Sequence, residues 1–298
     1  MGLEVSAHAK INLGLEILRK LENGMHELNM ITQSVSLCDY VNVSINSENV
    51  GIRLTCDKNI CQLEENIAYK AAEYFFRDFG IFCNGIEIHI NKNIPVKSGL
   101  GGGSADAAAV IFALSKIYGV IESNYNDFLS FFLQNPKNSE KILKISSKIG
   151  SDVPICLIGG TLIFSNNIFK SIAPIQDCKI ILIKPGFGIS TKQAYNEFDS
   201  NSFLEKPKDR IENLELAIIS KNIDNIFKKV FNDFECIQNH HDRFKLTGSG
   251  SARFRIFSDK KNAEFVFSKI CKKKQNNSYV FLCEPVNFGV KIIDNFRN

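Results

Sequence analysis

The sequence predicts an α+β protein with two domains, and three observations support this class. The chain has 298 residues, which corresponds to about two domains at roughly 150 residues each. In its first half, strand patterns are followed by well-capped helices. Past about residue 168 the pattern changes, and helices and strands follow in an order typical of a second layered domain. We therefore predict one domain over residues 1–168 and another over residues 169–298.

Composition excludes several classes of protein. Apolar residues make up 44% of the chain and charged residues 23%, as in ordinary globular proteins. The net charge of +4 is small and spread along the chain, which does not favour a nucleic-acid groove. The longest nearly apolar stretch, 155–164, is far shorter than the roughly 20 residues that span a bilayer. Nine scattered cysteines without a C-x-x-C pair, and no signal-peptide pattern, predict a reduced cytoplasmic protein.

The elements of the first half are predicted from periodicity and capping. Apolar residues alternate over 11–17, so this segment is a strand on which Lys10 and Asn12 share one face. Asn66 is a suitable N-cap for a helix running to Gly80. Gly150 is a suitable end for a helix over 140–149. The remaining predictions are strands at 30–36, 40–45 and 86–90, an alanine-rich helix ending near Gly119, an irregular segment over 123–139, and buried strands over 155–164 with a turn at Gly159-Gly160.

The sequence of the second half predicts fewer helices and strands. Thr191 caps a short helix, and Asp259 caps a helix to about residue 272. Two amphipathic helices cover about 210–236. Strands are expected at 179–184, 244–247, 252–257 and 279–283.

A glycine-rich loop is the strongest functional signal. Glycines 99, 101, 102 and 103 permit positive φ and expose backbone N–H groups, directly before the alanine-rich helix. The positive end of the helix macrodipole adds to them, so this segment predicts a phosphate-binding site. Ser104 is either a helix N-cap or a hydroxyl near a phosphate-bound Mg²⁺, and the two roles are compatible. Asp106 lies in the first helical turn and is expected to be a dipole partner.

Two familiar phosphate loops fit these residues poorly. The P-loop needs glycine followed by lysine and then serine or threonine, which this segment lacks. The dinucleotide pattern G-x-G-x-x-G is met at Gly99 and Gly101, but its third position is Ser104. A nicotinamide-dependent oxidoreductase is therefore a distant alternative.

Three segments together resemble the motifs of the GHMP kinase superfamily. They are Ala9-Lys-Ile-Asn-Leu13, the loop from Pro95 to Ala108, and Leu246-Thr-Gly-Ser-Gly-Ser251. The resemblance implies a ribosomal-protein-S5-domain-2-like ATP domain, a ferredoxin-like second domain, and an active site in the cleft between them. It implies that Gly248, Ser249 and Gly250 close against the phosphate loop, and that ATP, with Mg²⁺, is the co-substrate. The implied ATP-binding residues are Pro95, Val96, Lys97, Ser98, Gly99, Leu100, Gly101, Gly102, Gly103, Ser104 and Ala105.

Further motifs resemble one branch of that superfamily. Gly24-Met-His26 and Gly150-Ser-Asp-Val-Pro154 are similar to kinases that phosphorylate the 2-hydroxyl of 4-diphosphocytidyl-2-C-methyl-D-erythritol, in the non-mevalonate route to isoprenoid precursors. The resemblance implies that Asp152 is the base that accepts the hydroxyl proton. It implies that Lys10 orients the hydroxyl and offsets charge on the transferred phosphoryl group. Asn12 is expected to donate a hydrogen bond to substrate or phosphate.

The substrate wall departs from the family pattern. The resemblance implies that His26, Thr191 and Tyr195 contact the cytidine substrate, with His26 at the pyrimidine edge and Tyr195 as an aromatic wall. Two further aromatic positions of the family are occupied by Met25 and Thr32. Methionine packs on ring faces through its thioether, so cytosine binding can persist in weaker form.

Two functional alternatives remain at this stage. Another GHMP-type kinase, acting on homoserine or mevalonate, would differ in the substrate wall. A noncatalytic nucleotide-binding module would lack a working pair such as Lys10 and Asp152. The expected partners are small molecules, with no nucleic acid and no membrane, in a monomer or weak homodimer. No protein metal cluster is predicted, and His240-His241-Asp242 is expected to be a solvated loop.

Overall fold

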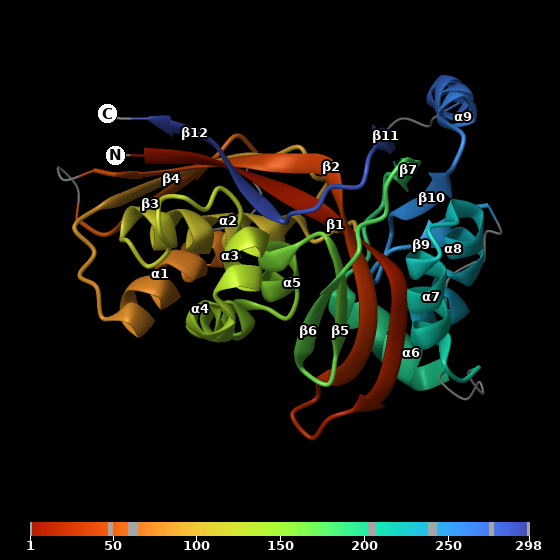
Figure 1. Cartoon of the computed structure of the whole chain (residues 1–298), viewed down its shortest axis with the longest axis horizontal. Coiled ribbons are helices and arrows are strands. Elements are labelled where there is room, and N and C mark those ends of the chain that lie inside the picture. The colour runs from red at the N-terminus through yellow and green to blue at the C-terminus, as the bar shows by residue number, and fades with distance from the viewer. Residues whose placement is uncertain are drawn as a thin grey trace.

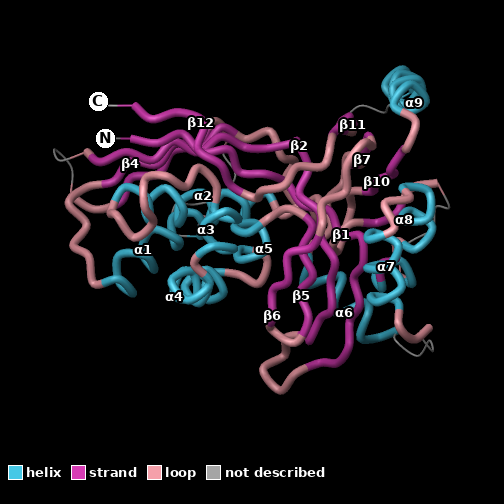
Figure 2. Tube along the Cα trace, in the orientation of Figure 1, coloured by secondary structure: helices cyan, strands magenta, loops and turns pink. Residues whose placement is uncertain are grey.

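The structure is a computed structural model. It describes residues 2–46, 50–58, 65–201, 207–237, 243–273 and 277–296. Within these ranges the chain forms two sheets, and helices pack against both of them (Figures 1 and 2). His240-His241-Asp242 lies outside the described residues.

The larger sheet is built around two long antiparallel strands. Its central order is β12-β1-β2-β4-β3, while β5 and β6 continue from β2, and β8 pairs in parallel with β1. The alternating apolar side chains of β1, such as Ile11 and Leu13, are fully buried. The strands are β1 (Gly2–Lys20), β2 (His26–Ile45), β3 (Ile52–Cys56), β4 (Ile86–Asn91), β5 (Thr161–Ser165), β6 (Ile168–Ile172), β8 (Phe231–Asn232) and β12 (Val290–Phe296).

Five helices cover one face of the larger sheet (Figure 1). The central one is α2, whose residues 105–115 are all buried because small alanines let it pack closely on every side. Asn66 caps α1, where its side chain accepts the N–H of Ala68, and Gly80 ends it with a φ of 67°. The helices are α1 (Ile67–Phe79), α2 (Gly102–Ile117), α3 (Phe128–Gln134), α4 (Pro136–Ile149) and α5 (Val153–Ile158).

The smaller sheet lies in the second half of the chain. Its order is β11-β7-β10-β9, and all of its pairs are antiparallel. Asp259 caps α9 by accepting the N–H of Lys261, as the sequence predicts. The elements are β7 (Lys179–Lys184), α6 (Thr191–Asn201), α7 (Arg210–Ile219), α8 (Ile223–Lys229), η2 (Asp233–Cys236), β9 (Lys245–Leu246), β10 (Arg253–Phe257), α9 (Lys260–Lys273) and β11 (Tyr279–Cys283).

The β1–β2 hairpin connects the two halves. Both strands run past the first set of helices, and their far end lies beside α6 and α7 (Figure 1). The pairing of β1 with β2 shifts register between Asn12 and Gly14. Such a shift turns the following side chains to the other face of the sheet.

Three sequence predictions about elements are wrong. Residues 153–158 form helix α5 instead of a strand, because Pro154 occupies the first helical turn, where proline is favoured. A six-residue apolar run cannot be assigned by periodicity alone. Residues 123–139 contain α3, capped by Asp127, and the beginning of α4. Past α8, the region up to Cys236 is a short strand and a 3₁₀ turn instead of helix.

The C-terminal strand β12 was not predicted. It pairs antiparallel with β1, from Gly2 opposite Phe296 to Ala7 opposite Val290. The last strand of the chain therefore belongs to the larger sheet. We retain the division near residue 168 as a proposal, with the amendment that β12 is assigned to the first domain.

Candidate active site

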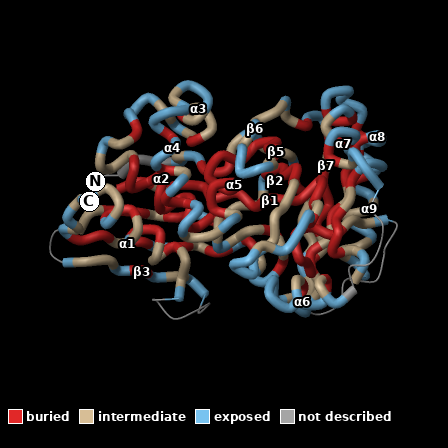
Figure 3. Tube along the Cα trace, turned by 90° about the horizontal axis from the view of Figure 1, so that it is seen from below, coloured by how far each residue is buried: buried red, intermediate tan, exposed pale blue. Residues whose placement is uncertain are grey.

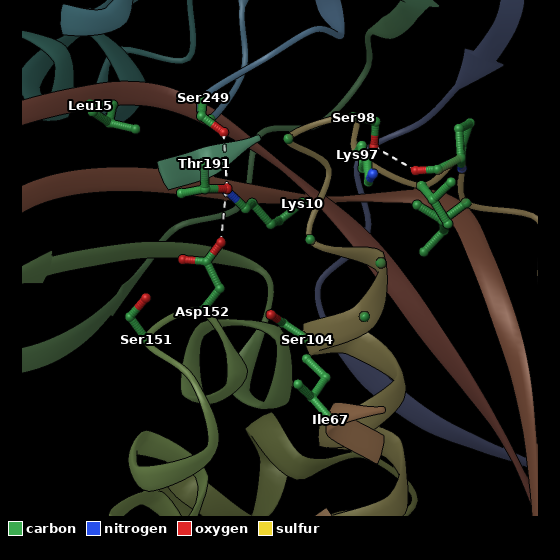
Figure 4. A pocket seen from close by; sticks show the side chains of 18 of the residues that line it. Lys10, Leu15, Ile67, Lys97, Ser98, Ser104, Ser151, Asp152, Thr191 and Ser249 are labelled. Atoms are coloured by element: carbon green, nitrogen blue, oxygen red, sulfur yellow. Dashed lines mark hydrogen bonds and ion pairs between the residues drawn. The ribbon is translucent and has the colours of Figure 1, made fainter. Parts of the chain in front are cut away.

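A cavity of about 330 Å³ lies where the glycine loop, the β1–β2 hairpin and α6 meet. Figure 4 shows that Lys10, Ser104, Asp152, Thr191 and Ser249 surround the same space. In Figure 3, buried segments occupy the middle of both halves, around α2 and α5 in the first and around β7 in the second. The cavity therefore brings together the glycine loop, Lys10 with Asp152, and Thr191 with Tyr195, whereas the predicted residues Asn12, His26, Leu100 and Ala105 are not among those that line it.

The glycine loop leads directly into α2. Gly101 is the N-cap of the helix with a φ of 76°, and Gly99 has a φ of 79°. Gly102 and Gly103 are already helical, so positive φ is confined to two of the four glycines. Ser104 lies in the first turn and is not the N-cap; its side chain faces the cavity (Figure 4). The free N–H groups of the first turn make this end of α2 suited to an anion.

The third glycine segment packs directly on the first. The N–H of Ala252 donates to the carbonyl of Ser98 at 2.9 Å. A Cβ atom on Gly248 would lie 2.8 Å from the Gly99 oxygen, and one on Gly99 would lie 2.3 Å from the Thr247 oxygen. Only glycine permits this approach of two backbones. The predicted closure residues Gly248 and Ser249 line the cavity beside the loop, and Gly250 forms the turn behind them.

Lys10 and Asp152 form an ion pair at the cavity wall. Lys10 Nζ lies 3.2 Å from Asp152 Oδ2, and the lysine side chain is only 5% exposed, whereas the aspartate is 32% exposed. Asp152 immediately precedes α5. Lys10 Nζ also donates to Asn12 Oδ1 at 2.7 Å. The ammonium is thus held between two oxygens, and the carboxylate has its free side toward the cavity (Figure 4).

Asn12 is buried and is bonded to protein groups. Its Oδ1 also accepts the N–H of Gly248 at 3.0 Å, and its Nδ2 lies 3.5 Å from Met30 Sδ. Its own N–H donates to Thr247 Oγ1. These bonds connect Lys10 with the third glycine segment. The substrate contact expected for Asn12 stays a prediction.

Helix α6 contributes Thr191 and Tyr195 to the cavity wall. Thr191 Oγ1 lies 3.2 Å from Ser249 Oγ, and Tyr195 lines the cavity. Burial, and then the negative charge of Asp152, raise the pKa of Tyr195. His26 stacks on Tyr195 with ring centroids 4.4 Å apart and planes 14° apart. One face of the tyrosine is therefore covered by the histidine.

Met25 and Thr32 do not occupy the cavity wall. Met25 is 55% exposed at the hairpin tip, and Thr32 is buried opposite Asn12 on β2. The apolar wall is instead made by residues that the sequence analysis missed: Leu15, Leu28, Met30 and Phe234. Leu28 and Met30 follow His26 at the strand period of two, which could have suggested a shared face. The register shift that brings Leu15 to the cavity has no sequence signal.

A buried charge cluster lies below the glycine loop. Lys92 Nζ donates to carboxylate oxygens of both Asp39 and Asp106, and all three side chains are 6% exposed or less. Asp39 Oδ1 also accepts the N–H groups of Asn93 and Ile94, which lead into the loop. Burial raises the pKa of Asp106 well above its usual range. One cation between two acids favours a proton on one of them, and Asp106 is the acid with an oxygen that lacks a partner.

No group of three or more His, Cys, Asp or Glu residues is arranged to hold a metal ion within the described ranges. No described helix is both long and apolar enough to cross a bilayer.

Comparison with known proteins identifies the class first. Residues 66–160 match the model of the GHMP kinases N terminal domain. A crystal structure of 4-(cytidine 5'-diphospho)-2C-methyl-D-erythritol kinase has a TM-score of 0.69 at 22% identity, covering 95% of this chain and 99% of that one. The Methanococcus jannaschii mevalonate kinase has a TM-score of 0.67 at 16% identity, with coverage of 96% and 98%. The chain has the fold of the GHMP kinases.

The relatives by sequence identify the family. The chain is 35% identical to 4-diphosphocytidyl-2-C-methyl-D-erythritol kinase of Clostridium tetani, covering 93% of this chain and 99% of the relative. It is 33% identical to the kinase of the same name from Clostridium acetobutylicum, with the same coverage of both chains. The chain belongs to the 4-diphosphocytidyl-2-C-methyl-D-erythritol kinase family.

Proposed function

We propose that this kinase transfers the γ-phosphoryl group of ATP to the 2-hydroxyl of 4-diphosphocytidyl-2-C-methyl-D-erythritol. Family membership supports the substrate, and the Lys10–Asp152 pair beside the glycine loop carries the chemistry. A homoserine or mevalonate substrate is less favoured, because proteins of those names are similar at 18% and 16% identity in fold alone.

In the proposed mechanism, Asp152 accepts the proton of the attacking hydroxyl. Its carboxylate is partly exposed at the cavity wall, so an alcohol in the cavity is within its reach. Lys10 holds that carboxylate in place through the 3.2 Å contact and supplies positive charge where phosphoryl transfer develops negative charge. Asn12 orients Lys10 from behind. The proton moves from the hydroxyl to Asp152 while the new P–O bond forms and the bond to ADP breaks.

The polyphosphate would bind at the N-terminus of α2. The backbone N–H groups of its first turn and the loop glycines offer donors without side-chain charge. Mg²⁺ fits this site as an ion that arrives with ATP, since it usually keeps waters and phosphate ligands and needs few protein oxygens. The Ser104 hydroxyl and the Asp152 carboxylate are among the oxygens lining the cavity, and they would hold it beside the N-terminus of α2. When bound, Mg²⁺ neutralises charge on the transferred phosphoryl group.

The direct test is an assay of the purified full-length chain with ATP, Mg²⁺ and a panel of alcohols. The panel contains 4-diphosphocytidyl-2-C-methyl-D-erythritol, homoserine and mevalonate. We expect ADP formation with the first alone, and phosphorus NMR should place the new phosphate on the 2-hydroxyl. ADP formation with homoserine or mevalonate instead would contradict the proposed substrate.

Three further expectations remain proposals. The absence of a nucleic-acid partner is supported by the small, dispersed net charge of +4. A cytoplasmic location is supported by the eight described cysteines, all of which are free thiols. A monomer or weak homodimer is the expected oligomeric state, and light scattering measures it.

A further inference from the structure

A largely buried arginine of α7 binds two acids near the cavity. Arg210 Nη2 lies 3.0 Å from Glu16 Oε1 on β1 and 2.8 Å from Asp233 Oδ1 in η2. All three side chains are 17% exposed or less, so water screens these ion pairs only weakly. The guanidinium also lies over the Phe231 ring, 4.2 Å from its centroid. One guanidinium group therefore ties helix α7 to the long strand β1 and to the η2 turn.

The hydrogen bonds of these acids continue into the β1–β2 hairpin. Glu16 is the direct cross-strand partner of Asn29 on β2, and Asn29 Nδ2 donates to Glu16 Oε2 at 3.3 Å. Asp233 Oδ2 accepts the N–H of Ile17 on β1 at 2.8 Å. We call Arg210, Glu16, Asp233 and Asn29 the Arg210 network. Its four members come from α7, β1, η2 and β2, so it joins four elements.

The apolar wall of the cavity is built from the immediate sequence neighbours of this network. The pairs are Leu15 with Glu16, Leu28 and Met30 with Asn29, and Phe234 with Asp233. Successive side chains of a strand point to opposite faces, so on β1 and β2 the network lies on the face that turns away from the cavity. The wall is therefore backed by polar side chains that Arg210 connects.

This backing fixes the end of the cavity that is expected to take the alcohol. Phe234 lies 5.0 Å from Tyr195 between ring centroids, so the wall continues the side on which Tyr195 is expected to contact the alcohol substrate. Helix α7 lies directly on β1, since a Cβ atom on Gly14 would be only 3.0 Å from Leu214 Cδ2. We propose that Arg210 is a positioning residue for the alcohol substrate, because it fixes the spacing between the hairpin and Phe234. The inference rests on the proposed function.

Arg210→Met is the variant that tests this role. It keeps an unbranched apolar stem but leaves Glu16 and Asp233 as two largely buried carboxylates without their shared cation. Their repulsion should separate β1 from the η2 turn and displace the wall. Arg210→Lys restores a cation and should rescue most of the loss, because Nη2 alone makes both ion pairs. Lys170→Met is the matched control, since it breaks the more exposed 2.7 Å ion pair that β6 makes with Glu215 of the same helix.

The first measurement reports on the wall independently of activity. Met30 belongs to the wall, and the chain has three methionines, so methyl-labelled methionine gives a simple NMR spectrum of the full chain. The Met30 signal is assigned by its absence in Met30→Leu. We expect it to move in Arg210→Met and to return toward its wild-type position in Arg210→Lys. Lys170→Met should leave it unchanged, and the signal of Met25, at the exposed hairpin tip, should stay in place in all three variants.

The second measurement is steady-state kinetics with ATP, Mg²⁺ and the cytidine substrate. We expect Arg210→Met to lower kcat/KM for the alcohol by about tenfold or more, mainly through KM, while the KM for ATP stays within about twofold. Arg210→Lys should recover most of this loss, and Lys170→Met should match the wild type. Asn29→Ala removes the bond to Glu16 and leaves every charge in place. It should therefore raise the alcohol KM by a smaller factor and move the Met30 signal.

The outcomes separate this inference from the proposed function. A wild type that does not phosphorylate the cytidine substrate overturns the proposed function, and the Met30 signal then decides alone whether Arg210 fixes the wall. With an active wild type, an unchanged alcohol KM in a folded Arg210→Met variant overturns the role of Arg210. Equal rises of the KM for ATP and for the alcohol also overturn it, because they indicate a general structural loss. If Arg210→Met does not fold, an unchanged Met30 signal and alcohol KM in Asn29→Ala overturn the inference.

Discussion

Lys10 Nζ donates a 2.7 Å hydrogen bond to Asn12 Oδ1, and the same oxygen accepts the N–H of Gly248. One amide oxygen therefore connects the proposed catalytic lysine with the glycine segment of the second half. Because both residues are buried, this bond is protected from water. It makes the orientation of Lys10 depend on where the third glycine segment lies.

We expect Asn12→Leu to lower kcat by about 10- to 100-fold, because a displaced ammonium no longer aligns Asp152 with the hydroxyl. Asn12→Asp is the matched control, since it keeps an oxygen acceptor for both donors and should lose less. Steady-state kinetics of the two variants provide the measurement. Equal losses would mean that Asn12 acts by contacting substrate through its NH₂ group.

Asp152→Asn should remove nearly all turnover while the fold persists. A neutral amide cannot accept the hydroxyl proton, and loss of a general base costs about 10²- to 10⁴-fold. The side chain is isosteric, and Lys10 retains its bond to Asn12. Ser151→Ala, at the neighbouring cavity residue, serves as the control and should retain most activity. The assignment of Asp152 as the base fails if the variant keeps more than about a tenth of the wild-type kcat.

Local chemistry explains which elements could be predicted. The side chains of Asn66 and Asp259 cap helices by accepting backbone N–H groups two residues further along the chain. Capping rules therefore locate α1 and α9. The face shared by Lys10 and Asn12 follows from strand period alone. The glycine loop could be recognised from the sequence because few other kinds of structure need such a run of glycines.

Long-range contacts explain what could not be predicted. Asp199 meets Lys20 across 179 residues of sequence, and no local pattern indicates that pairing. Strand β12 is defined by its partner β1 at the opposite end of the chain. The cluster of Lys92, Asp39 and Asp106 likewise joins three separate segments. In each case tertiary packing, not local propensity, selects the arrangement.

Gly101→Ala should impair both nucleotide binding and turnover. Gly101 has a φ of 76°, and a Cβ there would lie 3.1 Å from Lys10 Cγ and 3.3 Å from Cys156 Sγ. A non-glycine residue in the left-handed region costs about 1–2 kcal/mol, and the added methyl group would displace Lys10. We expect kcat/KM for ATP to fall by about tenfold or more. Gly103→Ala, with its nearest contact at 3.4 Å, should be milder, and similar losses would indicate crowding of the nucleotide instead.

The buried cluster predicts unequal losses of stability for two substitutions. Lys92→Met would leave Asp39 and Asp106 facing each other without a cation, and removal of one partner from a buried ion pair costs about 3–5 kcal/mol of unfolding free energy. Asp106→Asn should cost much less, because an amide resembles the protonated acid. Urea denaturation compares the two variants with the wild type. A larger loss for Asp106→Asn would mean that Asp106 carries the negative charge.

The same cluster predicts a pH dependence of stability. The pKa of Asp106 is raised in the folded state above its unfolded value of 3.8, so the folded chain binds more protons between those two values. Stability contributed by this group therefore falls as pH rises from about 4 toward the folded-state pKa. Asp106→Asn lacks that titration. Its unfolding free energy should improve relative to the wild type as pH rises, and a constant difference would contradict the prediction.

Tyr195→Ala should weaken the proposed cytidine substrate and leave the KM for ATP unchanged. Tyr195 lines the cavity and stacks on His26, so its removal takes away an aromatic wall and the support of the histidine ring. Stacking of a base on an aromatic side chain is worth about 1–3 kcal/mol, so the substrate KM should rise by roughly 5- to 150-fold. Tyr195→Phe keeps the ring and should behave like the wild type.

Met25→Ala is the second control for this prediction, because Met25 is 55% exposed at the hairpin tip. It should leave the KM of both substrates unchanged. An unaltered cytidine KM in Tyr195→Ala would mean that Tyr195 only packs on Phe234, 5.0 Å away between ring centroids. A raised KM for ATP would instead mean that ATP binds at the end of the cavity proposed for the alcohol, and the alcohol at the end proposed for ATP. A cytidine KM raised by Met25→Ala would place the base at the hairpin tip, outside the wall formed by Leu28 and Met30.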